Sequence, residues 1–419
     1  MPDYSSETDP LAKSTAEILA GLHVLQILPR LESGGVEQGT LDVARALVQA
    51  GAKADVAAMG GRLVGPLEKA GAIFHALPVH SKNPLVMIAN VVRLRRLIRR
   101  QGINIVHARS RAPAWSALLA ARLEGVPFVT TYHGTYSEHS LFKRFYNSVM
   151  ARGDLVIANS LFIAEQIKAR YRLPAERIIE IARGVDLSQY DPKEISPARV
   201  QKFREVCGLV PQDKQLVILM PGRLTAWKGH EVMIEALALL RLSAPADLAP
   251  FICICLGDYQ SRHFKMMLSK RIETEGLKSC MRLAGYYNDM PAAYAGCDIV
   301  VSPSVEPEAF GRVAIEAQAM MKPVIAADHG GARETVIAPS QGNAIAAGED
   351  HISGLRVKPG DANALAEALY ELLRLDPEER NSIGANGRRH VSAHFSLVSM
   401  CARTLAVYVW LARKARGES

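Results

Sequence analysis

The feature that most constrains the fold is an alternation that runs along the whole chain. Short apolar runs rich in β-branched residues are separated by longer stretches with helical periodicity. This alternation is typical of βαβ units, in which parallel strands form a sheet and helices cover its faces. The runs fall into two series, and the polar stretch SQYDPKEISPAR with its prolines lies between them. The chain is therefore predicted to be an α/β protein with two sheets.

Because 419 residues exceed what one hydrophobic core usually supports, we expect two domains, each with a Rossmann-like parallel sheet, facing each other across a cleft. The first series predicts strands at 23–28, 55–59, 104–106, 128–131, 155–158 and 178–181. The second predicts strands at 216–220, 251–256, 281–284, 298–301 and 323–326.

The domain boundary is predicted near residue 190 because the linker-like stretch lies there. Residues 1–18 are expected to be a disordered tail, 19–190 the first domain and 191–396 the second. Helical patterns follow the second sheet at 362–373, 377–394 and 397–415. The last of these has no strand after it, so the segment 397–419 is expected to cross back to the first domain.

Bulk properties limit the function classes. The polar, acidic amino terminus lacks a basic n-region, no apolar run reaches about 18 residues, and the six cysteines show no metal-ligand spacing. These features favour a cytoplasmic protein with reduced cysteines. A net charge of +8 suits nucleic acid, anionic lipid or a phosphorylated substrate, and does not choose among them.

Charged residues follow the first strand of the second series. Arg223 and Lys228 lie in PGRLTAWKGHEV, between a predicted strand and a helix. In open parallel sheets ligands bind at the carboxyl ends of the strands, and two cations beside a helix N-terminus suit a diphosphate. Two solvated surface cations are the alternative. Gly34 and Gly35 follow the first strand of the chain and would either admit a ligand or form a plain turn.

Two carboxylates follow the predicted strand at 298–301. Glu308 lies in the loop and Glu316 lies in the helix that starts near Gly311. The loop carboxylate can accept hydrogen bonds from sugar hydroxyls, the helix N-terminus can bind phosphate, and the helical carboxylate can bind a ribose. A capping Glu308 and a surface Glu316 are the alternative. However, Glu316 lies within the apolar stretch VAIEAQAM, where a carboxylate is costly unless paired or ligated.

These motifs occur in a fixed order: GGVEQ, HG, ANS, GVD, GRLTAWKG, LAGY, EAFGRVAIEA and HGGARE. The set resembles the group 1, family 4-like retaining glycosyltransferases of the GT-B fold, which include bacterial lipopolysaccharide-core and mannosyl transferases. The resemblance covers residues 22 to 396. It implies an acceptor domain followed by a domain for a UDP- or GDP-sugar, with transfer of a hexose to an acidic, lipid-linked saccharide and retention of the anomeric configuration.

The resemblance also implies roles for individual residues. Arg223 and Lys228 would hold the donor diphosphate, Glu308 would meet the transferred sugar and Glu316 the ribose. The further donor contacts that it implies are Gly34, Gly35, Tyr286, Phe310 and Gly311, with His133 on the opposing face as a catalytic residue. Arg183 stands where the family usually has Asn, which puts the contacts of that loop in doubt.

The expected chemistry needs no metal ion. As the bond to the diphosphate lengthens, negative charge grows on the leaving group, and fixed cations with a helix N-terminus can stabilise it. The sequence contains no D-x-D pair to hold Mg²⁺ or Mn²⁺. We therefore expect no metal ligands and no cofactor, since the nucleotide sugar is a substrate.

The acceptor is expected at the carboxyl edge of the first sheet. The basic residues there, together with His133, are His107, Arg109, Arg111 and His139. They would suit an acidic glycolipid, or the arginines would pair with local carboxylates. The segment VVRLRRLIRR turns Val91, Leu94, Leu97 and Ile98 to a core and its arginines outward. Such a helix either lies on an anionic membrane, which would make the protein peripheral, or is simply solvated.

Two other functions compete with the transferase. A sugar-nucleotide epimerase of the same fold would convert the donor without an acceptor. A basic module that binds nucleic acid would suit the high pI, but the aromatic residues are not interleaved with the basic runs. We therefore expect no nucleic-acid partner.

Overall fold

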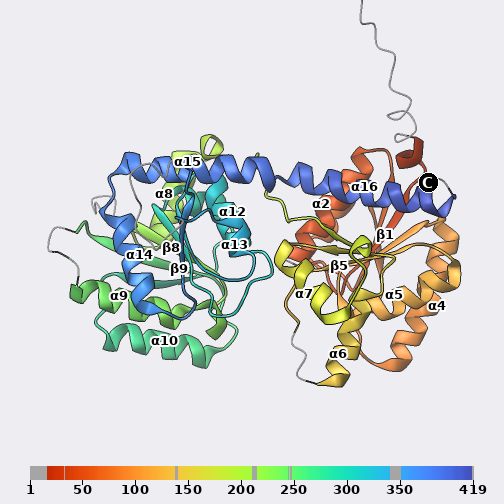
Figure 1. Cartoon of the computed structure of the whole chain (residues 1–419), viewed down its shortest axis with the longest axis horizontal. Coiled ribbons are helices and arrows are strands. Elements are labelled where there is room, and N and C mark those ends of the chain that lie inside the picture. The colour runs from red at the N-terminus through yellow and green to blue at the C-terminus, as the bar shows by residue number, and fades with distance from the viewer. Residues whose placement is uncertain are drawn as a thin grey trace, which may run out of the picture. The chain divides into compact units, whose positions relative to one another are not determined.

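The computed structural model describes residues 17–32, 34–136, 140–209, 215–243, 245, 248–339 and 351–417. The chain divides into two compact units (Figure 1). Unit 1 comprises Met1–Ala182 and Val398–Ser419, and unit 2 comprises Arg183–Leu397. Of the tail predicted at 1–18, residues 1–16 lie outside the described residues, and Ile18 is buried in unit 1, so this residue does not belong to a free tail.

Unit 1 is built on a seven-stranded parallel sheet with the order β3-β2-β1-β4-β5-β6-β7. Its strands are β1 His23–Ile27, β2 Lys53–Ala58, β3 Ile73–Ala76, β4 Ile105–Ala108, β5 Phe128–Tyr132, β6 Leu155–Ala158 and β7 Ile178–Glu180. The strand order reverses direction between β1 and β4, which is the point where open parallel sheets bind ligands.

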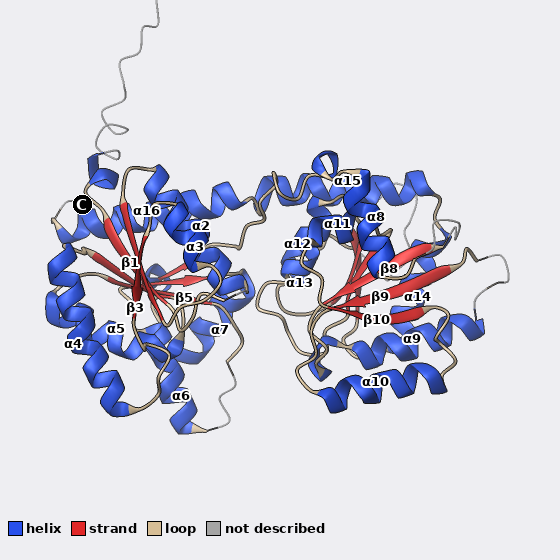
Figure 2. Cartoon of the chain, turned by 180° about the vertical axis from the view of Figure 1, so that it is seen from behind, coloured by secondary structure: helices blue, strands red, loops and turns tan. Residues whose placement is uncertain are grey.

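Helices cover both faces of this sheet (Figure 2). They are α2 Gly35–Gln49, α3 Val64–Lys69, α4 Pro84–Gln101, α5 Arg111–Glu124, α6 Leu141–Asn147, α7 Leu161–Tyr171 and α16 Leu397–Ala415. Helices α2 and α16 lie on one side of the sheet, and α4 and α5 lie on the other. The last helix of the chain therefore packs on the first unit, as its pattern predicted.

Unit 2 is built on a six-stranded parallel sheet with the order β10-β9-β8-β11-β12-β13. Its strands are β8 Leu216–Pro221, β9 Phe251–Leu256, β10 Met281–Gly285, β11 Ile299–Ser302, β12 Val324–Ala327 and β13 Gly354–Val357. Its helices are α8 Pro197–Val206, α9 His230–Ser243, α10 Arg262–Thr274, α11 Met290–Ala295, α12 Arg312–Ala319, α13 Ala332–Thr335, α14 Ala362–Arg374 and α15 Pro377–His394. Helices α9, α10 and α14 cover one face of the sheet, and α8, α12 and α15 cover the other (Figures 1 and 2).

The core explains why the strand prediction succeeded. In unit 2 the residues of β8, β9 and β11 are almost all buried, because helices cover both faces of the sheet. Continuous apolar runs are the sequence signal of such strands, and the predicted runs match the observed strands to within a few residues. The edge strands β3 and β13 were missed, because IFHA and GLRV carry little of that signal.

The helix ends follow local sequence rules. Helix α4 begins with Asn83 accepting a hydrogen bond from the Leu85 N–H and with Pro84 in its first turn, and it ends at Gly102 in the left-handed conformation. Helix α15 begins with a capping box between Asp376 and Glu379. On α4, Leu94 and Ile98 are buried as its periodicity predicted. Among the described residues, no helix is both long enough and apolar enough to cross a membrane.

Candidate functional site

The strongest cluster of charge at the carboxyl edge of unit 2 is the pair Lys228–Glu308. The Lys228 Nζ atom lies 2.8 Å from the Glu308 Oε1 atom, and the side chains are only 14% and 18% exposed. Lys228 comes from the turn before α9, and Glu308 comes from the loop between β11 and α12. The sequence predicted that both residues lie at strand ends, and the structure brings them into contact.

The backbone holds these two loops together. The Val305 N–H donates to the Trp227 carbonyl oxygen at 2.8 Å. Gly229 follows Lys228 with φ of 79°, and a Cβ atom there would lie 2.0 Å from the Pro303 carbonyl oxygen. Only glycine permits that approach. The close approach of the two loops is therefore fixed by their backbones, which brings the Lys228 and Glu308 side chains within reach of each other.

Further hydrogen bonds fix the Glu308 carboxylate. The Ser304 hydroxyl donates to Oε1 at 2.6 Å, and the Ser302 hydroxyl lies 3.4 Å from the same atom. Burial alone would raise the pKa of Glu308, but the charge of Lys228 and these hydrogen bonds outweigh burial and lower the pKa. The carboxylate is therefore ionised at neutral pH and can accept hydrogen bonds from hydroxyl groups.

Glu316 is not a surface residue. Its side chain is 11% exposed, and Oε1 lies 2.6 Å from the Arg312 guanidinium one helical turn earlier on α12. The Tyr294 hydroxyl donates to Oε2 at 3.1 Å from α11. The apolar surroundings predicted that this carboxylate must be paired or ligated, and it is paired. Donors on α11 and α12 thus orient the Glu316 carboxylate.

The other residues predicted in unit 2 lie around these pairs. Gly311 precedes α12 with φ of 87°, and no side chain caps the N–H groups of that helix. Arg223 is exposed and makes no ion pair with another described residue. Tyr286 is 60% exposed, whereas Phe310 is 2% exposed and packs against Phe395. Phe310 therefore supports the loop from beneath rather than lining a surface.

At the carboxyl edge of unit 1, two predicted acceptor residues are buried. The His107 Nδ1 atom lies 2.6 Å from the Tyr408 hydroxyl, and Nε2 lies 2.7 Å from the Thr131 hydroxyl. Burial and the charge of Arg109 hold the pKa of His107 well below its usual range, so the ring is neutral. Arg109 is itself only 5% exposed. In this structure neither side chain is presented to solvent, and direct contact with an acceptor stays a prediction.

The remaining predicted residues of unit 1 are more accessible. Arg111 donates to the Asn147 side-chain oxygen at 2.8 Å, and its guanidinium lies 4.0 Å from the centre of the Tyr136 ring. His133 is half-buried directly after β5. Gly34 and Gly35 lie at the N-terminus of α2. His139 lies outside the described residues.

Sequence reasoning missed several members of the unit 2 cluster. Arg312 could have been found, because it stands four residues before Glu316 on a predicted helix. Ser304 and Tyr294 carry no local signal, since only the fold brings them to the carboxylates. His230, which is fully buried at the start of α9, was also missed. Its burial and, to a smaller extent, the charge of Lys228 lower its pKa to about 4. The imidazole ring near Lys228 is therefore neutral.

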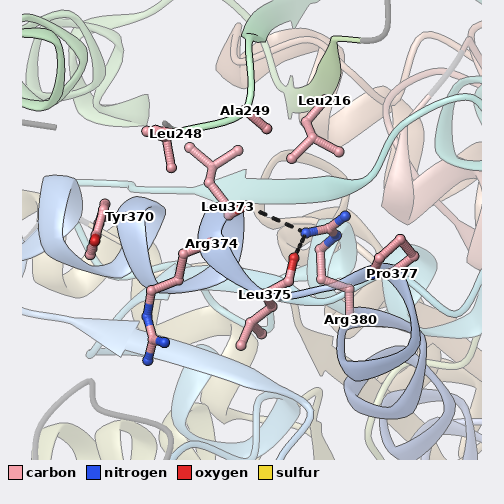
Figure 3. A pocket seen from close by; sticks show the side chains of 9 residues that line it. All are labelled: Leu216, Leu248, Ala249, Tyr370, Leu373, Arg374, Leu375, Pro377 and Arg380. Atoms are coloured by element: carbon pink, nitrogen blue, oxygen red, sulfur yellow. Dashed lines mark hydrogen bonds between the residues drawn. The ribbon is translucent and has the colours of Figure 1, made fainter. Parts of the chain in front are cut away.

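A cavity of about 360 Å³ lies elsewhere in unit 2 (Figure 3). It is lined by Leu216, at the amino end of β8, and by Arg380, whose guanidinium donates to carbonyl oxygens at the end of α14. Arg380 thus closes that helix end. The cavity is at the edge of the sheet opposite to the Lys228–Glu308 pair. Among the described residues, no cluster of His, Cys, Asp or Glu could hold a metal ion.

Family profiles match both units. Residues 33–189 match the profile described as Glycosyltransferase Family 4, and residues 208–390 match Glycosyl transferases group 1. The second match contains Lys228, Glu308 and Glu316, and the first contains His107 and His133. The motifs that carried the resemblance in the sequence thus lie within the matched regions.

Individual proteins agree with these profiles. A D-inositol 3-phosphate glycosyltransferase from Jonesia denitrificans is 30% identical over 339 residues, which cover 73% of this chain and 71% of that protein. The crystal structure of a glycosyltransferase from Rickettsia africae is 35% identical, with a TM-score of 0.80, over 95% of this chain and 99% of that one. HepE from Anabaena, crystallised with UDP-glucose, is 25% identical with a TM-score of 0.75, over 92% of this chain and 100% of that one.

Proposed function

Since the chain belongs to the group 1 glycosyltransferases of the GT-B fold, we propose that it moves a hexose from a nucleoside diphosphate sugar to a hydroxyl of an acidic acceptor, with retention of the anomeric configuration. UDP is the preferred nucleotide, and GDP is the alternative. The complex of HepE with UDP-glucose supports UDP, because that protein is similar to this chain over most of its length.

One observation carries the proposal: the buried Lys228–Glu308 pair stands beside the N-terminus of α12, which no side chain caps. A cation and free N–H groups suit the diphosphate, and a fixed carboxylate suits the hydroxyls of the sugar. Arg223, exposed on the loop after β8, supplies a second cation. All three types of contact that a nucleotide sugar needs are thus present within one unit.

The same groups serve the reaction. As the bond between the anomeric carbon and the diphosphate lengthens, the leaving group gains negative charge, and Lys228, Arg223 and the N–H groups of α12 stabilise it. Glu308 holds the sugar by its hydroxyls, and Glu316 accepts from the ribose. Lys228, Glu308 and Glu316 are held in place by their partners before the donor arrives, so they need little reorganisation in the transition state. This chemistry needs no metal ion.

On the acceptor side, we propose that unit 1 binds an acidic saccharide and that the saccharide is linked to lipid, as in a lipopolysaccharide core. Arg111 and His133 are the accessible candidates for contact with the acceptor. His107 and Arg109 would reach it only after the packing around α16 changes, because both are buried. The protein would act at the cytoplasmic face of the membrane as a peripheral protein.

A second acceptor class is favoured by a specific observation. The proteins similar to this chain include D-inositol 3-phosphate glycosyltransferases from several organisms, such as Jonesia denitrificans and Catenulispora acidiphila. A small phosphorylated cyclitol is also an acidic acceptor, and it would bind the same basic side chains. The two classes differ in whether a membrane is needed.

A thermal-shift screen tests the donor. UDP, GDP, ADP and their glucose and mannose derivatives are added to the full-length protein, with and without EDTA. A ligand at 100 times its dissociation constant stabilises the native state by about 2.7 kcal/mol, so the matching nucleotide raises the melting temperature. We expect UDP compounds to give the largest shift and EDTA to leave it unchanged. If no nucleotide shifts the melting temperature, the donor assignment is wrong.

The acceptor and the stereochemistry need a second measurement. The protein is incubated with the donor found in the screen and with either a phosphorylated inositol or a lipopolysaccharide-core acceptor, and the product is analysed by NMR. Retention predicts an α-linked product from an α-linked donor. Consumption of the donor with epimerisation and without transfer would instead indicate the epimerase alternative.

A further inference from the structure

Large apolar side chains are exposed together on helix α6 of unit 1. Leu141, Phe142 and Phe145 have exposed fractions of 85%, 80% and 57%. Their spacing places them on one side of the helix. Apolar residues scattered singly on a surface are ordinary, but a contiguous group of this size marks a site of interaction.

The helix presents these side chains from a fixed position. The rings of Trp115 on α5 and Phe145 are stacked, with centres 5.2 Å apart. The Trp115 indole N–H also donates to the Tyr146 carbonyl oxygen at 3.2 Å. The helix begins with Ser140, whose hydroxyl accepts from the Lys143 N–H. The exposed group is therefore part of the folded unit.

The apolar group continues on α5. Trp115, Leu119 and Leu123 are spaced by four residues and so follow one side of that helix, and Leu119 and Leu123 are 51% and 58% exposed. We refer to Trp115, Leu119 and Leu123 together with Leu141, Phe142 and Phe145 as the α5–α6 surface.

Positive charge lies beside the α6 part of this surface. Lys143 and Arg144 are exposed on α6, which contains no acidic residue. The Arg152 guanidinium lies 5.2 Å from the centre of the Trp115 ring and 5.5 Å from that of Phe145. Aromatic and aliphatic side chains beside lysine and arginine match the boundary between lipid chains and anionic headgroups.

Helix α4, whose arginines made it the membrane candidate in the sequence, is a weaker match. It exposes Leu85 and Ile88 near its start. Near its end, however, Arg95 and Arg99 both form ion pairs with Glu124 on α5, at 2.6 and 2.5 Å. Part of the charge of α4 is therefore already neutralised within the protein.

We propose that the α5–α6 surface docks unit 1 onto an anionic lipid bilayer, with Leu141 and Phe142 inserted below the headgroups and Lys143, Arg144 and Arg152 against the phosphates. This deepens the proposed function and rests on it for the lipid-linked acceptor. A second copy of the chain fits this surface less well. In a twofold contact at this surface, the lysine and arginine of one copy would face the same residues of the other copy. Helix α6 has no acidic residue to pair with them.

Vesicle sedimentation of the full-length protein tests the proposal. Vesicles of phosphatidylcholine alone are compared with vesicles that also contain phosphatidylglycerol, at low and high salt. We expect binding to the anionic vesicles, weakened by salt. The double variant Leu141→Ser/Phe142→Ser removes the inserted side chains and should weaken binding at least about tenfold. Lys143→Gln should lower the affinity less and reduce its dependence on salt.

The matched control is Leu242→Ser, because Leu242 lies on α9 of unit 2 and is 86% exposed, as much as Leu141. This variant should bind vesicles like the wild type. Equal vesicle binding by the double variant and the wild type would overturn the proposal. So would sedimentation showing a wild-type dimer that the double variant converts to a monomer, because a second copy would then occupy the surface.

The donor site is measured separately. Titration calorimetry with UDP should give the same affinity for the wild type and the double variant. The α5–α6 surface includes neither Gly34 nor Gly35, and the other proposed donor residues are in unit 2. If the double variant loses vesicle binding but still binds UDP, the result supports membrane docking by the α5–α6 surface. If the wild type binds vesicles but not UDP, the donor assignment is wrong and the membrane-docking proposal for the α5–α6 surface is unaffected.

Discussion

The carboxyl edges of the two sheets use their charged residues differently. In unit 2, Lys228 after β8 pairs with Glu308 after the neighbouring strand β11, and Arg312 pairs with Glu316 within α12. In unit 1, the equivalent edge buries His107, which is hydrogen bonded to Tyr408 of α16. One architecture thus serves two purposes. Unit 2 pairs opposite charges at a site proposed to bind the donor, whereas unit 1 uses a strand-end polar side chain to attach helix α16.

The largest effect on activity is expected from Lys228→Ala. The substitution removes the cation proposed to bind the diphosphate and leaves Glu308 without its ion-pair partner. Loss of a charge-assisted contact of about 1.5–3 kcal/mol should lower kcat roughly ten- to a hundredfold. The measurement is turnover of the donor found in the thermal-shift screen. Lys270→Ala is the control, because Lys270 is exposed on α10. Full turnover by Lys228→Ala would show that the unit 2 pairs are only structural.

The counterpart in unit 1 is Tyr408→Phe. It leaves the buried Nδ1 atom of His107 without its hydroxyl partner, at a cost of about 1–3 kcal/mol in the free energy of unfolding. We expect a lower melting temperature and an unchanged UDP affinity, as measured by thermal unfolding and calorimetry. A stable variant with weakened UDP binding would contradict the division of labour between the units.

A smaller effect is expected from Tyr294→Phe. The variant removes one of the donors that orient the Glu316 carboxylate, a contact worth about 0.5–1.5 kcal/mol. Because Glu316 is assigned to the ribose, KM for the donor should rise about two- to tenfold with little change in kcat. A 2′-deoxyribose donor should lose this sensitivity. If only kcat falls and KM is unchanged, Tyr294 contributes to the chemical step and not to donor binding.

The smallest effect concerns pH. The folded pKa of Glu308 is lowered from its ordinary value of 4.5, so the pair stabilises the protein above that pH and the stabilisation is lost as pH falls through the folded pKa. In Lys228→Met the charge of Lys228 no longer opposes burial, so the pKa of Glu308 should be higher than in the wild type. The gap in melting temperature between wild type and variant should therefore be widest near neutral pH and narrow below about pH 4.5. A gap independent of pH would mean that Glu308 is not coupled to Lys228.

The sequence was sufficient for the features that depend on local patterns. Continuous apolar runs predicted the buried strands, and helical periodicity predicted α15 and α16 with their observed bounds. The strand-end positions of Lys228 and Glu308 followed from the same patterns. The strands β3 and β13 did not, because their sequences IFHA and GLRV contain no continuous apolar run.

Features that depend on long-range contacts could not be predicted. His107 looked like an accessible acceptor ligand, because nothing near it in the chain reveals that Tyr408, 301 residues later, will cover it. The Tyr294 hydroxyl reaches Glu316 from a different helix, 22 residues away. The exposed apolar residues of α6 resemble those of a core helix in sequence. Only the fold distinguishes them.

The assignment of α16 to unit 1 has a consequence for synthesis of the protein. The ribosome completes the seven strands of unit 1 by Glu180, but the helix that covers His107 is not available until the last residues emerge. Until then, unit 1 exposes an apolar face where Tyr408 and Leu411 will pack. A nascent chain therefore carries an unfinished amino-terminal half throughout translation of the carboxyl-terminal half, and premature termination near residue 397 would leave that half incomplete.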